Sequence, residues 1–274
     1  MKKRAFGFLK LEELPKKPRK TSVVEIRGSY YSPVTYTYLN DLFEIAGDYI
    51  DGFKFVAGCQ RFYTPESVKK FTGLCKKHRI YVSTGGMIER VILQGKKGVD
   101  AYLKESKKLG FDVLEISSGF ADISFEDQLK IIKKARGIGL KVKPEISFME
   151  GAGGGTHIAG YKPKYRSVER LFEQAEAYLK AGAYKLMLES EGITEDLPAK
   201  KWRKDIIKKA IDRFGVERWM FEASDPEVFK WYLKHYGREV NVFIDHSQVF
   251  EFNAWRHGLW GDKDIWKGKK IRYS

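Results

Sequence analysis

The chain has 274 residues, of which 43% are hydrophobic and 32% are charged, with only 8 prolines. This globular composition excludes the collagen-like, disordered and disulfide-scaffold classes. No stretch approaches the roughly 20 apolar residues of a membrane helix, and the lysine-rich beginning lacks the apolar core of a signal peptide. We therefore expect a cytoplasmic protein without membrane contact, folded as one domain of the usual barrel size, about 250 residues.

The charge balance favours anionic partners. Lysine and arginine number 51 against 36 acidic residues, which gives a formal charge of +15. Such a charge attracts small acids and nucleic acids alike. The lysine runs are interleaved with apolar residues at helical spacing, which is typical of a solvated helix face. A small anionic substrate is therefore the favoured partner, with nucleic acid the less favoured one. Cys59 and Cys75 show no metal or disulfide spacing, so we expect buried thiols.

Short β-forming segments recur along the chain, separated by lysine-rich amphipathic stretches. They begin at Val23, Gly52, Ile80, Phe111, Leu140, Tyr184, Arg218 and Val240. The first five lie about 30 residues apart, the length of one strand and helix unit. Eight such units predict a closed (β/α)8 TIM-type barrel in a single domain. We assign the barrel to residues 21–262, after a basic N-terminal arm at 1–20 and before a basic C-terminal tail at 263–274.

Carboxylates stand at the ends of six predicted strands. They are Glu25, Glu115, Glu145, Glu189, Glu222 and Asp245. One such residue is more often a salt-bridge partner, but the carboxyl ends of all barrel strands meet at one mouth. Several buried carboxylates need compensating cations, for which Lys54, Arg27, Lys143 and a divalent metal are candidates.

Hard oxygen ligands with few histidines nearby suit Mg²⁺ better than zinc. The predicted ligands are Glu115, Glu145, Glu189 and Glu222. Ser117 lies two positions beyond Glu115, on the same face of its strand.

Glycine-rich segments follow several strands. The segment at 150–165 lacks the lysine of a Walker loop, so it is either a lid over the mouth or a surface loop. It carries His157, a possible proton donor, although a lone histidine is more often passive. Tight turns are expected at Gly85 and Gly86. Further tight turns are expected at Gly258 and Gly261, in the segment after the eighth strand. The last loops of barrels commonly bind phosphate, so we expect these glycines to do so.

Three segments resemble the phosphosulfolactate synthase family of coenzyme M biosynthesis. They are GDYID at Gly47–Asp51, LGFDVLEISSGFADIS at Leu109–Ser124 and RHGLWGD at Arg256–Asp262. The resemblance runs from about residue 18 to 262 and implies a Mg²⁺-dependent lyase that adds sulfite to phosphoenolpyruvate to give (2R)-phospho-3-sulfolactate. For such a reaction in this chain we expect catalytic roles for Lys54, Glu115, Glu145, Lys143 and His157. We expect substrate and phosphate binding by Arg27, Gly85, Gly86, Ser117, Arg256, Gly258 and Gly261.

The chain departs from the family pattern at three positions. Arg27 stands for a lysine, Met149 for a second lysine and Glu191 for an arginine. One interpretation is a synthase with a rearranged site. Another is a barrel enzyme with the same carboxylate-ringed metal site that acts on a different carboxylic acid.

A third interpretation belongs to a different class of protein. The family includes heat-stress-associated plant relatives, and Trp202, Trp231 and Tyr232 lie near lysine-rich segments. These features suggest a non-catalytic stress or nucleic-acid-binding protein. The tryptophans at 255, 260 and 266 favour a homo-oligomer, because such residues often form subunit contacts.

Overall fold

The computed structural model describes residues 4–28, 32–153, 162–195, 197–223 and 225–263. Eight parallel strands pair in chain order, and β8 pairs with β1, which closes the barrel. The strands are β1 (Val24–Gly28), β2 (Gly52–Phe55), β3 (Tyr81–Ser83), β4 (Val113–Ile116), β5 (Lys141–Ile146), β6 (Leu186–Leu188), β7 (Trp219–Glu222) and β8 (Val242–Asp245). The predicted (β/α)8 barrel is confirmed.

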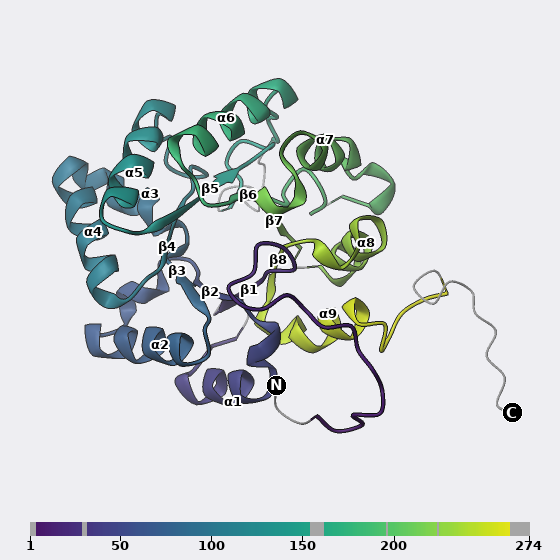
Figure 1. The fold of residues 1–274 in the computed structure, drawn as a ribbon. Coiled ribbons are helices and arrows are strands. Elements are labelled where there is room, and N and C mark those ends of the chain that lie inside the picture. The colour runs from purple at the N-terminus through teal and green to yellow at the C-terminus, as the bar shows by residue number, and fades with distance from the viewer. Residues whose placement is uncertain (1–3, 29–31, 154–161, 196, 224, 264–274) are drawn as a thin grey trace, which may run out of the picture.

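The helices form a ring around the strands (Figure 1). They are α1 (Tyr36–Ala46), α2 (Pro65–Lys77), α3 (Ile88–Val91), α4 (Gly95–Leu109), α5 (Phe125–Gly137), α6 (Val168–Ala181), α7 (Lys204–Phe214), α8 (Pro226–Tyr236) and α9 (Val249–Arg256). Side-chain oxygens of Thr35, Thr64, Ser124, Ser167 and Asp225 accept hydrogen bonds from first-turn N–H groups and thereby fix five helix starts.

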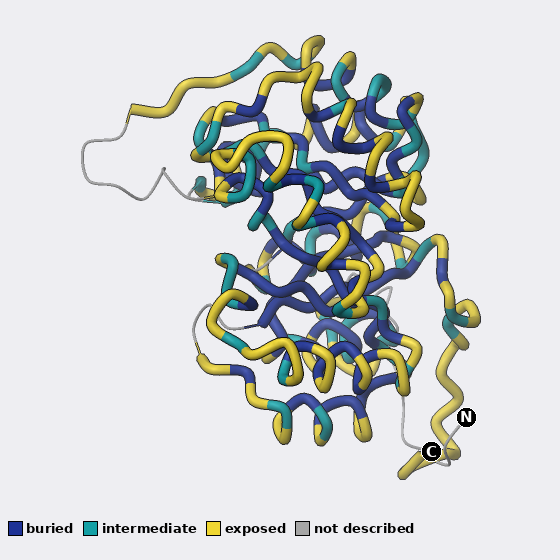
Figure 2. Tube along the Cα trace, turned by 90° about the vertical axis from the view of Figure 1, so that its left-hand side faces the viewer, coloured by how far each residue is buried: buried dark blue, intermediate teal, exposed yellow. Residues whose placement is uncertain are grey.

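The main apolar core lies between the strands and the helices, and Figure 2 shows the buried strands at the centre of the molecule. A second apolar cluster consists of Val23, Val56, Met187, Met220 and Phe243. The Phe243 ring lies 4.3 Å from the Lys54 ammonium, so this cluster shares the barrel interior with charged side chains.

Both cysteines are free thiols, Cys75 buried and Cys59 half-buried. No helix among the described residues is long and apolar enough to cross a membrane.

The N-terminal arm covers the end of the barrel where the strands begin (Figure 1). Arg19, which is buried, donates to both carboxylate oxygens of Asp51 at 2.9 and 3.0 Å. Asp51 also accepts from the Val24 N–H at 3.0 Å, so the arm is tied to the start of β1. Arg4 forms an exposed ion pair with Asp48 at 2.9 Å.

The aromatic residues considered for base stacking are largely inaccessible. Trp202 is 8% exposed and Tyr232 is 2% exposed, because both pack into the main core. Trp231, the third residue considered, is half-buried. The nucleic-acid hypothesis stays a prediction. Trp255 is half-buried and Trp260 is 70% exposed, whereas Trp266 lies outside the described residues. The homo-oligomer stays a prediction.

The buried ion pair between Arg19 and Asp51 allows a first test, which measures thermal stability. Asp51→Asn keeps the side-chain shape but removes the charge that compensates Arg19. Loss of one partner of a buried ion pair costs about 3–5 kcal/mol. We expect the melting temperature to fall by about 10 °C in a thermal unfolding scan.

Asp48→Asn is the matched control, because it removes an exposed pair worth about 1 kcal/mol or less. Equal melting temperatures of the two variants would contradict the proposed role of Asp51.

Candidate active site

Two charged layers occupy the barrel interior. Side chains two residues apart on a strand point to the same face, which places Glu25 below Arg27 and Lys143 below Glu145. The lower layer is fully buried. The Lys143 ammonium donates to Glu25 Oε1 and lies 3.0 Å from Glu115 Oε2, and the Tyr81 hydroxyl donates to Glu25 Oε2 at 2.6 Å.

Lys54 links the lower layer to the mouth of the barrel. Its ammonium lies 2.6 Å from Glu115 Oε1 and 3.3 Å from Glu145 Oε1. Burial opposes the positive charge, but the surrounding carboxylates, with Glu115 foremost, raise the pKa of Lys54 well above its ordinary value. Lys54 is therefore a permanent cation at the base of the mouth.

Glu145 stands out among the carboxylates. Burial, followed by the charge of Glu115, raises the pKa of Glu145 to about 8. Burial also opposes ionisation of Glu115, but Lys54 and Lys143 outweigh it and lower the Glu115 pKa. At neutral pH, Glu115 is thus an anion while Glu145 holds a proton.

Glu189 and Glu222 form a second carboxylate pair. Burial and then the neighbouring Glu222 raise the pKa of Glu189 well above its ordinary value. Burial opposes ionisation of Glu222, but the hydrogen bond from Glu189, with Lys54 and Arg27, lowers its pKa. The pair shares one proton. Arg27 lies 3.7 Å from Glu222 and 3.5 Å from Asp245.

Arg27, Lys54 and four of the carboxylates line a cavity of about 700 Å³ at the carboxyl ends of the strands. Among the described lining residues, seven are acidic and four are basic. The acids are Glu89, Glu115, Glu145, Glu189, Glu191, Glu195 and Glu222, and the bases are Arg27, Lys54, Arg61 and Arg90. Arg61 and Arg90 were not predicted from the sequence, although they lie in the segments that follow β2 and β3.

The turn after β3 lies where the sequence predicts it. Gly85 has a φ of +61°, and a Cβ there would lie 1.9 Å from the Phe55 carbonyl oxygen, so only glycine fits. Gly86 and Ser117 line the cavity, and the Ser117 hydroxyl donates to the Gly86 carbonyl at 3.5 Å. Lys143 does not line it and is 1% exposed.

Arg256, Gly258 and Gly261, which we expected to bind phosphate, are not among the described residues that line the cavity, and their role in phosphate binding stays a prediction. These residues follow helix α9, which returns the chain to the end of the barrel where the strands begin. Arg256 donates there to the Ser22 carbonyl at 3.2 Å, and burial lowers its pKa to about 9.

The predicted lid begins at the cavity. Its base is a short ladder in which Glu150 N–H donates to the Lys164 carbonyl at 2.9 Å. Gly153 N–H donates to Glu191 Oε2 at 2.6 Å, beside the cavity. His157 lies outside the described residues, and the lid function stays a prediction.

The carboxylates differ in how well they could serve as metal ligands. Within the described part of the chain, no three acidic, histidine or cysteine side chains are grouped closely enough to hold a metal ion. Both oxygens of Glu115 face lysines. Glu189 and Glu222 instead offer oxygen donors with one shared proton, a donor set that suits Mg²⁺.

Fold and cavity together define a (β/α)8 barrel whose charged site lies at the strand ends, where barrel enzymes carry out catalysis. The family model described as (2R)-phospho-3-sulfolactate synthase (ComA) matches residues 12–262, and the chain belongs to this family.

Two curated relatives cover most of the chain. Protein HEAT-STRESS-ASSOCIATED 32 of Arabidopsis thaliana is 33% identical over 91% of this chain and 91% of its own length. The phosphosulfolactate synthase of Methanothermobacter thermautotrophicus is 26% identical over 90% of this chain and 92% of its own length. Among solved structures, the tetrameric deoxyribose phosphate aldolase from Aeropyrum pernix superposes with a TM-score of 0.53 at 13% identity, covering 86% of this chain and 91% of its own. That likeness supports the barrel fold alone.

The raised pKa of Glu145 gives stability a pH dependence. Between pH 5 and 8 the folded protein holds a proton that the unfolded chain releases, so stability falls as the pH rises. Glu145→Gln removes this dependence. We subtract the melting temperature of the wild type from that of Glu145→Gln at each pH. We expect this difference to increase by about 3 °C or more between pH 5.5 and pH 9.

Glu169→Gln, an exposed change on α6, is the control. A constant difference between Glu145→Gln and the wild type across this range would contradict the raised pKa.

Proposed function

We propose that the protein adds sulfite to the methylene carbon of phosphoenolpyruvate, giving (2R)-phospho-3-sulfolactate. The observation that carries the proposal is a protonated carboxyl group, Glu145, beside the Lys54 cation in a cavity of a family barrel. A buried acid with a pKa near the working pH is suited to protonate a carbanion.

The four cations of the cavity would hold the anionic substrate. Arg27 and Lys54 come from β1 and β2, and Arg61 and Arg90 follow β2 and β3. Guanidinium groups match phosphate and carboxylate geometry through paired N–H donors. Arg61 and Arg90 thus replace the cations that the family pattern places at positions 149 and 191.

In the proposed reaction, the sulfur lone pair of sulfite forms a bond to the methylene carbon. The electrons of the carbon–carbon double bond move to C2 and the substrate carboxylate. Glu145 then gives its proton to C2, and solvent restores that proton. No group leaves, because the phosphate ester is retained. Lys54 stabilises the negative charge that develops on the carboxylate.

We also propose that Glu189 and Glu222 hold Mg²⁺. Bound there, the ion would supply further charge stabilisation for the substrate carboxylate. In its absence the two carboxyl groups share a proton, so binding the ion should release that proton.

The direct test of function incubates the protein with phosphoenolpyruvate, sulfite and Mg²⁺ and follows ³¹P NMR signals. We expect a new phosphate-ester signal that requires sulfite. Glu145→Gln should lower kcat by a factor of about 10²–10⁴ with a smaller change in KM, because general acids contribute that much. Glu169→Gln should retain wild-type rates. No new signal from folded, Mg²⁺-loaded protein would refute the synthase reaction.

Magnesium binding has a calorimetric test. Titration at pH 7 in buffers of different ionisation enthalpy should show release of about one proton per Mg²⁺ bound. Glu189→Gln should bind Mg²⁺ more weakly and release less. Unchanged binding by this variant would rule out Glu189 as a ligand.

The acidic excess of the cavity favours one second candidate, a reaction on a different carboxylic acid. Glu191 is 3% exposed where the family pattern has an arginine. A substrate without phosphate, or one with a positive group, would meet less repulsion there. Retained Mg²⁺ binding without sulfite-dependent turnover would support this candidate.

A further inference from the structure

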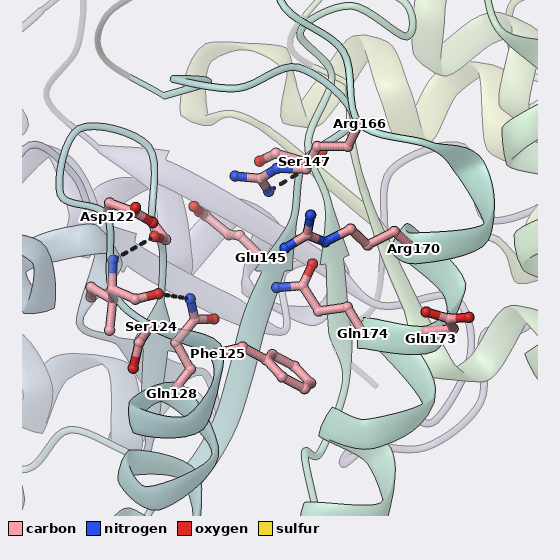
Figure 3. Close-up of a pocket in the computed structure, with 12 residues that line it drawn as sticks. Asp122, Ser124, Phe125, Gln128, Glu145, Ser147, Arg166, Arg170, Glu173 and Gln174 are labelled. Carbon is pink, nitrogen blue, oxygen red and sulfur yellow. Dashed lines mark hydrogen bonds between the residues drawn. The ribbon is translucent and has the colours of Figure 1, made fainter.

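A second hollow lies beside the main cavity, between the starts of α5 and α6. Its volume is about 430 Å³ (Figure 3). Its lining residues include Ser118 and Gln128 on one side and Arg166, Arg170 and Gln174 on the other.

The start of α6 and the loop before it supply the basic wall of the hollow. Helix α6 begins at Val168, and residues four apart on a helix share a face. Arg170 and Gln174 therefore point the same way. Arg166 lies before the N-cap Ser167, outside the helix, and the preceding loop brings it to the hollow. Figure 3 shows the Arg170 guanidinium directed between Glu145 and Gln174. The Arg166 guanidinium contacts the Ser147 carbonyl at 3.4 Å.

These two arginines retain their capacity for an anion. Among the described residues, no ion pair joins Arg166 or Arg170 to a carboxylate. The acidic lining residues Asp122 and Glu173 are exposed to solvent, as Arg170 is, whereas Arg166 is half-buried. Solvent therefore screens the charges of both acids and of Arg170 more than that of Arg166. The hollow thus presents two guanidinium groups, each with paired N–H donors that match an oxyanion.

The hollow adjoins the main cavity through shared walls. Glu145 lines both spaces. Ser117 lines the main cavity and its neighbour Ser118 lines the hollow. The Glu145 side chain therefore borders a ligand in either space.

Resting on the proposed function, we propose that the hollow is the binding site of the second substrate, a small sulfur oxyanion of the sulfite class. Two anionic substrates repel each other, so each needs its own cations until the new bond forms. Arg61 and Arg90 serve one anion in the main cavity, and Arg166 and Arg170 serve the other. Glu145 borders both spaces.

Calorimetric titration tests the site without turnover. Sulfite, inorganic phosphate and phosphoenolpyruvate are titrated separately into the wild type, Arg166→Gln, Arg170→Gln and Lys180→Gln. The last variant removes an exposed charge from the far end of α6 and is the matched control. We expect each arginine variant to weaken sulfite binding at least tenfold and to leave phosphoenolpyruvate binding within twofold.

Steady-state kinetics separates this proposal from the synthase proposal. Arg170→Gln should raise the KM for sulfite about tenfold and leave the KM for phosphoenolpyruvate unchanged. Turnover with an unchanged sulfite KM would overturn the second site and leave the function intact. Arginine-dependent sulfite binding without turnover would support the site and reject the reaction. Weaker phosphoenolpyruvate binding by Arg170→Gln would assign the hollow to the substrate phosphate and overturn the sulfite assignment.

Discussion

The interior of this barrel depends on the compensation of two buried lysines. Lys143 lies between Glu25 and Glu115, and Lys54 lies between Glu115 and Glu145. Each ammonium would be costly alone in a closed barrel, where little water reaches it. The carboxylates reduce that cost, so the charged residues must be present together. The interior of such a barrel is usually filled with layers of Val, Ile and Leu side chains. Here the apolar side chains of the interior form only a small cluster around Phe243.

This compensation determines the chemistry of the mouth. Both carboxylate oxygens of Glu115 form ion pairs with lysines, so Glu115 remains ionised. Its negative charge helps to keep Glu145 protonated. Further along the rim, Glu189 and Glu222 lie too close for both to ionise. At neutral pH, Glu145 and Glu189 are therefore protonated, whereas a glutamate in water would be ionised. Such perturbed carboxyl groups in a cavity are a mark of functional sites.

The sequence could predict those features that depend on repetition. Strands about 30 residues apart predicted the barrel. Of the six predicted strand-end carboxylates, Glu115, Glu145, Glu189 and Glu222 line the cavity, whereas Glu25 and Asp245 are not among its described lining residues. Depth along a strand was harder, because Lys143 and Glu145 share a face yet lie in different layers. The position of Arg256 was missed because α9 intervenes between β8 and that residue, and helix length decides which end of the barrel the chain reaches. Arg61, Arg90 and the second hollow depend on loop packing that no spacing rule reports.

The departures from the family pattern at positions 149 and 191 acquire a common explanation in the structure. Glu191 accepts the Gly153 N–H at 2.6 Å, and Met149 pairs with Tyr165 across the base of the inserted segment. Gly192, next to Glu191, has a φ of +73°, and a Cβ there would lie 3.0 Å from the Tyr165 ring. All of these residues therefore attach the insertion to the loop after β6. The carboxylate at 191 accepts a backbone N–H at the cavity edge, which reduces the repulsion that this charge reversal would otherwise exert on the proposed anionic substrate.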